Sequence, residues 1–120
     1  MASPTAPVAP TIAILGGLRI RRCLCDVVLL EVLQGIRNDT RFNEVRSLLT
    51  GLSILSTGGK STALRAAENY RTLRKRGITI RSTINCMIAT IAIDQRIPLL
   101  GNDREFEPFA RHLGLALVTP

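Results

Sequence analysis

Apolar residues in the second half of the chain alternate between helical spacing and short continuous runs. Residues 61–76 and the stretch after Ser82 repeat apolar positions every three or four residues, which predicts two helices with one buried face each. The buried stripe of the first is expected to be Ala63, Ala67, Tyr70 and Leu73, and Ser82 is the predicted N-cap of the second. The apolar runs at 97–100 and 115–118 predict strands, with a short helix between them at 105–113. Helices that alternate with short apolar strands indicate parallel strands joined by helical crossovers.

The first half of the chain contains the same two kinds of segment. A strand, or the residues that lead into one, is expected at 19–24, and a short strand at 53–56. Asp26 is a predicted N-cap for a helix that Gly35 ends, and Asp39 is a predicted N-cap for the next helix. We therefore expect an α/β fold in which helices pack on a buried sheet.

Composition supports this fold class and limits the chain to one domain. Hydrophobic residues make up 46% of the 120 residues and aromatic residues only 3%, so the core must be aliphatic, which suits helices on a parallel sheet. The first ten residues include three prolines and little that can be buried. We expect residues 1–17 to be a mobile or irregular segment and residues 18–120 to form the folded domain.

Several features bear on where the protein works. No apolar run reaches the roughly 18 residues that would span a bilayer, so no membrane partner is expected. No basic region precedes the apolar stretch 11–18, which is therefore not a signal peptide. The cysteines have apolar neighbours and lack the spacing of a zinc site. We interpret Cys23, Cys25 and Cys86 as small buried side chains of a cytoplasmic protein.

The charge of the chain points to an anionic partner. The net charge is +7, although solubility alone is a sufficient reason for it. Basic residues gather on the helix at 61–76 and just after it. The candidates for contacts with RNA phosphates are Arg71, Arg74, Lys75 and Arg81. Such contacts are electrostatic and independent of RNA sequence, and a solvated helix face is the alternative interpretation.

Two groups of acidic residues are candidates for metal-dependent chemistry. Glu31 lies within an apolar helix, where a carboxylate is paired, protonated or metal-bound unless it lies on the solvated edge. Asp103 and Glu105 follow the strand at 97–100, and ligand sites in parallel sheets lie beyond the carboxyl ends of strands. Carboxylates there can bind Mg²⁺ or Mn²⁺, but the helix dipole also favours acids at a helix start. The residues alone leave both interpretations open.

Four blocks of sequence carry a family resemblance. They are residues 25–35 (CDVVLLEVLQG), 66–81 (AAENYRTLRKRGITIR), 88–90 (IAT) and 102–109 (NDREFEPF). In this order they resemble the PIN-domain ribonuclease toxins of the VapC family. The resemblance extends over residues 18–118, which is nearly the whole chain, and the order and spacing of the blocks make it specific.

The resemblance implies a three-layer PIN-like fold, in which a parallel sheet is flanked by helices and acids bind Mg²⁺ or Mn²⁺. It implies an endoribonuclease toxin of a type II toxin–antitoxin module, with RNA as substrate and a cognate VapB-type antitoxin as partner. A homodimer is a further candidate assembly. Glu31 matches the family's helix acid and Asp103 the acid after the late strand, both in the catalytic role. Glu105, where the family commonly has Asp, is the third expected metal ligand.

Two features depart from the family pattern. The family begins with a strand that ends in a metal-binding Asp and leads into a helix, but the residues ahead of Leu18 contain no acid. This N-terminal strand–helix unit is therefore expected to be missing or replaced. Either residues 11–18 take over the role of its strand, or the domain is marginally stable. Asn85 stands where the family normally has Asp, and makes a degenerate, uncharged metal-binding position. We expect weakened cation binding and impaired cleavage; the alternative is an inactive PIN-domain remnant that binds an antitoxin or a toxin.

Overall fold

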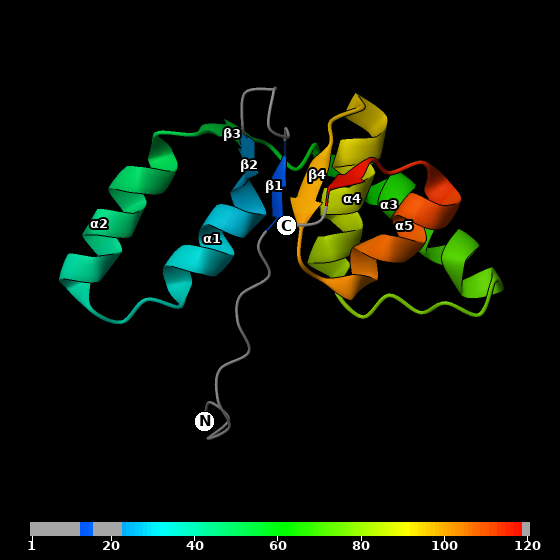
Figure 1. Cartoon of the computed structure of the whole chain (residues 1–120), viewed down its shortest axis with the longest axis horizontal. Coiled ribbons are helices and arrows are strands. Elements are labelled where there is room, and N and C mark those ends of the chain that lie inside the picture. The colour runs from blue at the N-terminus through cyan, green and yellow to red at the C-terminus, as the bar shows by residue number, and fades with distance from the viewer. Residues whose placement is uncertain (1–12, 16–22, 119–120) are drawn as a thin grey trace, which may run out of the picture.

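The computed structural model describes residues 13–15 and 23–118 (Figure 1). Its strands are β1 (Ala13–Leu15), β2 (Cys23–Cys25), β3 (Ser53–Leu55), β4 (Leu99–Gly101) and β5 (Leu117–Val118). Its α-helices are α1 (Asp26–Gln34), α2 (Asp39–Thr50), α3 (Gly59–Lys75), α4 (Thr83–Gln95) and α5 (Glu107–Leu113). A 3-10 helix, η1 (Arg104–Phe106), leads directly into α5. The α/β fold class expected from the sequence is confirmed.

The strands form one sheet in the order β3-β2-β1-β4-β5. The outer pairs are parallel: Leu24 of β2 is in register with Ile54 of β3, and Leu99 of β4 is in register with Leu117 of β5. The middle strand β1 runs antiparallel to both of its neighbours, β2 and β4. The sheet is therefore mixed, whereas the sequence pattern predicted parallel strands throughout.

Strand β1 differs from the sequence prediction, which placed residues 1–17 in a mobile or irregular segment. Residues 13–15 lie between β2 and β4 and close the gap between the two parallel pairs. An Ala-Ile-Leu run has the apolar character that a central strand needs, and without it two strand edges would remain unpaired. Residues 1–12 and 16–22, on which other sequence predictions fell, lie outside the described residues.

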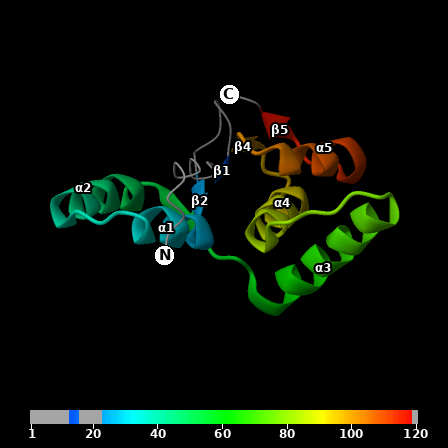
Figure 2. The same cartoon turned by 90° about the horizontal axis from the view of Figure 1, so that it is seen from below.

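Helices cover both faces of the sheet and make three layers. Helices α1 and α2 lie on one side, and α3, α4 and α5 lie on the other, an arrangement that both views show (Figures 1 and 2). Helix α4 contributes more buried apolar residues than any other described element: Cys86, Ile88, Ala89, Ile91 and Ala92 are all buried. The aliphatic residues of α4 thus hold the second helical layer against the sheet.

Three helix starts show how local sequence sets element boundaries. Ser82 is the N-cap of α4, as predicted, and its hydroxyl accepts a hydrogen bond from the backbone N–H of Asn85. The N-caps of α1 and α2 are one residue earlier than predicted, at Cys25 and Asn38. Asn38 competes with Asp39 as a cap because its side-chain oxygen accepts a hydrogen bond from Arg41 N at 2.9 Å.

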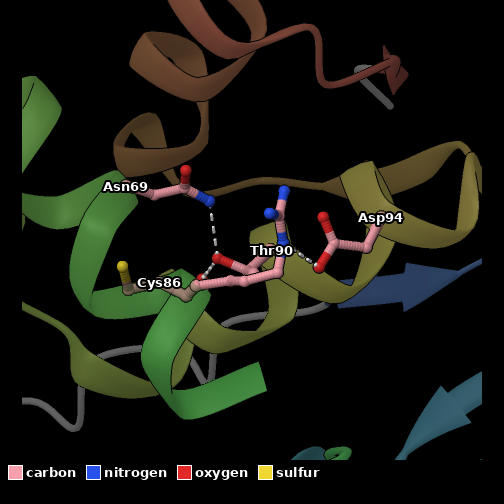
Figure 3. A network of polar contacts seen from close by, with 5 residues as sticks. Asn69, Cys86, Thr90 and Asp94 are labelled. Atoms are coloured by element: carbon pink, nitrogen blue, oxygen red, sulfur yellow. Dashed lines mark hydrogen bonds and ion pairs between the residues drawn. The ribbon is translucent and has the colours of Figure 1, made fainter. Parts of the chain in front are cut away.

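Helices α3 and α4 are joined by buried polar groups as well as by apolar packing (Figure 3). The Asn69 side chain donates to the Thr90 hydroxyl at 3.0 Å, and that hydroxyl donates to the Cys86 carbonyl at 2.7 Å. The Cys86 thiol in turn donates to the Ala66 carbonyl at 3.2 Å. Each polar group in this series of hydrogen bonds has a partner, and together the bonds hold α3 and α4 in one relative position.

Helix α2 is the least buried α-helix of the described part of the chain. It packs against α1 and buries no residue completely. Leu48 of α2 is 75% exposed and Leu30 of α1 is 62% exposed, so each helix of this pair presents a large apolar side chain to solvent. No helix among residues 13–15 and 23–118 has the length and apolar character needed to cross a bilayer.

Candidate functional site

The end of β4 and the start of α4 meet at one place, where polar side chains converge. Asp103 follows β4 closely and is the N-cap of η1, because one of its carboxylate oxygens accepts a hydrogen bond from Glu105 N at 2.9 Å. Its other carboxylate oxygen accepts a hydrogen bond from the Asn85 side-chain amide at 3.0 Å. The structure therefore brings two of the predicted site residues, Asn85 and Asp103, into direct contact.

Asn85 is held in this contact by the first turn of α4. Its backbone N–H is bound by the Ser82 side chain at 3.1 Å, and its side chain is only 3% exposed. A buried amide must satisfy its hydrogen bonds, and the Asp103 carboxylate accepts the one that Asn85 donates from its side-chain nitrogen. An aspartate at the same position would instead place two carboxylates together.

Glu105 joins the cluster from the other side of Asp103. Its two carboxylate oxygens accept hydrogen bonds from the backbone N–H groups of Arg81, at 2.5 Å, and Ser82, at 3.1 Å. These donors immediately precede α4. Glu105 thus ties η1 to the start of α4, and keeps the loop that carries Asp103 next to the turn that carries Asn85.

Glu31 is not part of this cluster. It is half-buried on α1, a helix whose main contacts are with β2 and α2. Among the residues that the structure describes, no group of three or more His, Cys, Asp or Glu side chains is close enough to hold a metal ion. Glu31, Asp103 and Glu105 therefore do not form a three-acid cluster here, although the sequence resemblance places them in one site.

The cluster offers the kind of atom that a divalent cation prefers. The carboxylates of Asp103 and Glu105 and the amide oxygen of Asn85 are hard oxygen donors. Mg²⁺ usually keeps several waters in proteins, and one or two carboxylates together with a substrate phosphate are enough to hold it. The carboxylate oxygens of Asp103 and Glu105 accept hydrogen bonds within the cluster, and Asn85 brings one negative charge fewer than an Asp would.

The cysteines near the site are poor nucleophiles. Burial raises the pKa of the Cys86 thiol, and the nearby charge of Glu105 raises it further. Burial also raises the pKa of Cys25, beside Asp26. A raised pKa lowers the thiolate population at neutral pH, and the thiolate is the reactive form. The sequence prediction that Cys25 and Cys86 are buried is confirmed, and Cys23 is half-buried.

The basic residues separate into two groups. Arg71 and Arg74 line a cleft of about 490 Å³ between α3 and α4, and the Arg74 guanidinium lies 5.4 Å from the centre of the Tyr70 ring. Lys75 and Arg81 are exposed but do not line this cleft. Sequence reasoning placed the four together on a basic face and did not find the cleft.

The alanines of α3 explain why the cleft was missed. Ala63 and Ala67 were predicted to belong to the buried stripe of this helix, but both are exposed and line the cleft. The buried alanine is Ala66, together with Leu73. Small residues at helical spacing look the same in a sequence whether a neighbour covers them or leaves a space.

Comparison with known proteins places this architecture in a family. An α/β domain with acidic residues beyond the carboxyl end of β4 belongs to a broad structural class, so fold and site alone do not define the family. The family model described as "PIN domain" matches residues 7–112, which is most of the chain.

The curated relatives narrow the class further. The VapC ribonuclease Mb1587 of Mycobacterium bovis is 31% identical over 91 residues, which cover 76% of this chain and 68% of that protein. The ribonuclease VapC11 of two Mycobacterium tuberculosis strains matches with the same identity and coverage. The chain therefore belongs to the PIN-domain family, in its VapC branch.

Proposed function

We propose that this protein is an endoribonuclease toxin of a type II toxin–antitoxin module, which cleaves RNA phosphodiesters in the cytoplasm with Mg²⁺ or Mn²⁺. The observation that carries the proposal is the contact of Asn85, Asp103 and Glu105 at the end of β4, in a chain that belongs to the PIN-domain family. The similar mycobacterial proteins Mb1587 and VapC11 are both named as ribonucleases.

Asp103 and Glu105 are the residues that would hold the cation, with the amide oxygen of Asn85 beside them. When bound, such a cation lowers the pKa of a water and stabilises charge on a phosphoryl group. Glu31 is the further acid that we propose for the site, on the strength of the sequence resemblance. Asp103 orients Asn85 through their hydrogen bond, and Glu105 holds both at a fixed separation by binding the start of α4.

We propose that cation affinity and turnover are reduced by Asn85. An amide oxygen carries no net charge and is a weaker ligand for a hard cation than a carboxylate. The expected behaviour is slow cleavage that needs a high cation concentration.

Cleavage of RNA by the purified protein tests the proposal. Single-stranded RNA incubated with Mn²⁺ should be cut, and EDTA or Asp103→Asn should abolish the cut products. Asn85→Asp should raise the rate at limiting Mn²⁺. Glu107→Gln is a matched control, since Glu107 is an exposed acid on the same segment. Intact RNA with both the native chain and Asn85→Asp would contradict an active nuclease.

We propose a VapB-type antitoxin as the protein partner, with the apolar surface of α1 and α2 as its binding surface. Leu30 and Leu48 are the exposed apolar side chains that support this placement. Failure of such an antitoxin to copurify with the toxin would contradict it. A homodimer is a second assembly that the relatives do not test.

The second candidate function is that of an inactive remnant which binds an antitoxin or a toxin. The uncharged Asn85 and the position of Glu31 outside the cluster favour it. Intact RNA in every arm of the cleavage experiment, together with retained antitoxin binding, is the result that distinguishes this candidate from the nuclease.

A further inference from the structure

The cleft between α3 and α4 is a built feature of the fold, separate from the acidic cluster. Its volume is about 490 Å³, within the range of roughly 300–1,000 Å³ that is usual for small-molecule sites. One wall is made by Ala63, Ala67 and Tyr70 of α3, and the opposite wall by Cys86 and Met87 of α4. The small side chains of Ala63 and Ala67 leave the cleft open, and most residues of the two walls are apolar.

The cleft combines this apolar interior with positive charge. Arg71 and Arg74 line it and are exposed, so their guanidinium groups reach solvent. Among the described residues the salt bridge is Arg65 with Asp94, and neither Arg71 nor Arg74 forms one there. Ser82 and Thr83 add hydroxyl groups to the lining. An occupant should therefore have a flat or apolar body, a negative charge and hydrogen-bonding edges.

The cleft and the acidic cluster share the first turn of α4. Ser82 lines the cleft, while its backbone N–H donates to Glu105. Cys86 lines the cleft, while the preceding Asn85 contacts Asp103. A ligand in the cleft is thus a near neighbour of the candidate site, on the α3 side of α4.

We propose that this cleft binds one nucleotide of the RNA, next to the phosphodiester that the acidic cluster would attack. The base lies between the Tyr70 ring and the Met87 side chain, where aromatic and sulfur groups offer stacking. Its phosphate lies at Arg71 and Arg74, and Arg74 is kept in place by the Tyr70 ring. The inference rests on the proposed ribonuclease function, since it gives that site a subsite for a flanking nucleotide.

Binding of ribonucleoside 5′-monophosphates to the full chain, in EDTA, tests the subsite without any cleavage. The probes are AMP, GMP, CMP and UMP, with inorganic phosphate as the reference, followed by amide chemical shifts in NMR spectra. Shifts at Ala67, Arg71, Ser82 and Thr83 are expected, with at least one nucleotide binding on the order of tenfold tighter than phosphate. Equal affinity for phosphate, or shifts elsewhere only, would overturn the proposal.

A matched pair of variants checks the place of binding. Ala67→Trp fills the cleft from an exposed helix position and should weaken nucleotide binding at least tenfold. Thr72→Trp adds the same bulk to the same helix at an exposed position outside the cleft, and should leave binding unchanged. Circular dichroism of both variants is the control that they fold. Equal effects of the two substitutions would contradict the proposal.

The outcomes separate the subsite from the nuclease. Nucleotide binding without RNA cleavage supports the subsite and removes the proposed function, whereas cleavage without nucleotide binding does the reverse. If Ala67→Trp changes only the sedimentation of the chain and not nucleotide binding, the cleft belongs to an interface between two copies and the proposal is wrong.

Discussion

The hydrogen bond from Asn85 to Asp103 is a contact that an amide makes and a carboxylate cannot make without a proton. In the native chain the buried amide donates to the carboxylate at 3.0 Å. The position after a strand predicted a site at Asp103 and Glu105, whereas Asn85 was placed beside them only by the family resemblance. The donor–acceptor pattern of Glu105 could not be predicted, since it depends on backbone positions.

The substitution Asn85→Asp should replace this hydrogen bond with repulsion between two carboxylates. Two like charges in a half-buried place raise the pKa of one carboxyl, so the free energy of unfolding should fall by about 1–2 kcal/mol at neutral pH. The raised pKa in the folded state means that the loss disappears as the pH falls below the ordinary carboxyl range. Mn²⁺ should then stabilise the variant more than the native chain. Thermal unfolding with and without MnCl₂ measures this, and equal Mn²⁺ shifts for both proteins would contradict it.

The pairing of α3 with α4 is the element-scale feature that organises the second half of the molecule. The apolar spacing of both helices predicted their existence and their approximate ends, and Ser82 was predicted as the cap of α4. The apolar spacing could not predict the cleft between α3 and α4, because Ala63 and Ala67 have the same spacing as the residues of a buried stripe. Strand β1 lies within residues 11–18, which the sequence offered as one possible replacement for the family's first strand, but three residues are too few to show a period that would decide it.

The polar link between α3 and α4 should contribute measurably to stability. Thr90 is completely buried, and its hydroxyl bonds to both Asn69 and the Cys86 carbonyl. Thr90→Val should lower the free energy of unfolding by about 1–2 kcal/mol, since buried partners lose a hydrogen bond. Urea unfolding of Thr90→Val, Asn69→Ala and the double variant provides a cycle. Strictly additive losses would show that the two side chains do not act together.

At the scale of the whole molecule, charge and shape are distributed unevenly over the two helical layers. The chain carries a net charge of +7. Arg71 and Arg74 lie on the layer of α3 to α5, whereas the apolar surface of α1 and α2 lies on the opposite side of the sheet (Figure 2). The net charge was readable from the composition, but its separation from the apolar surface depends on which helices cover which face.

Salt dependence of RNA binding should report this distribution. Each phosphate contact to a single strand contributes about 0.7 to the slope of log affinity against log salt. Replacing Arg71 and Arg74 by Gln should therefore reduce the slope by about 1.4 in EDTA, measured by filter binding over a KCl series. Arg37→Gln with Arg41→Gln removes the same charge from exposed positions, one just before α2 and one in its first turn. An equal reduction in this control would place the RNA elsewhere.

The reversed middle strand has a consequence for how the molecule comes apart. The sheet is two parallel pairs, β2 with β3 and β4 with β5, and β1 is the strand that connects them. We expect the sheet to open first at this strand, because separation there leaves both parallel pairs and the helices packed on them intact. Each half then keeps its own parallel pair and its own helices. Amide protons in β1 should exchange with solvent before those of α4, and the molecule should unfold as two units that separate at β1.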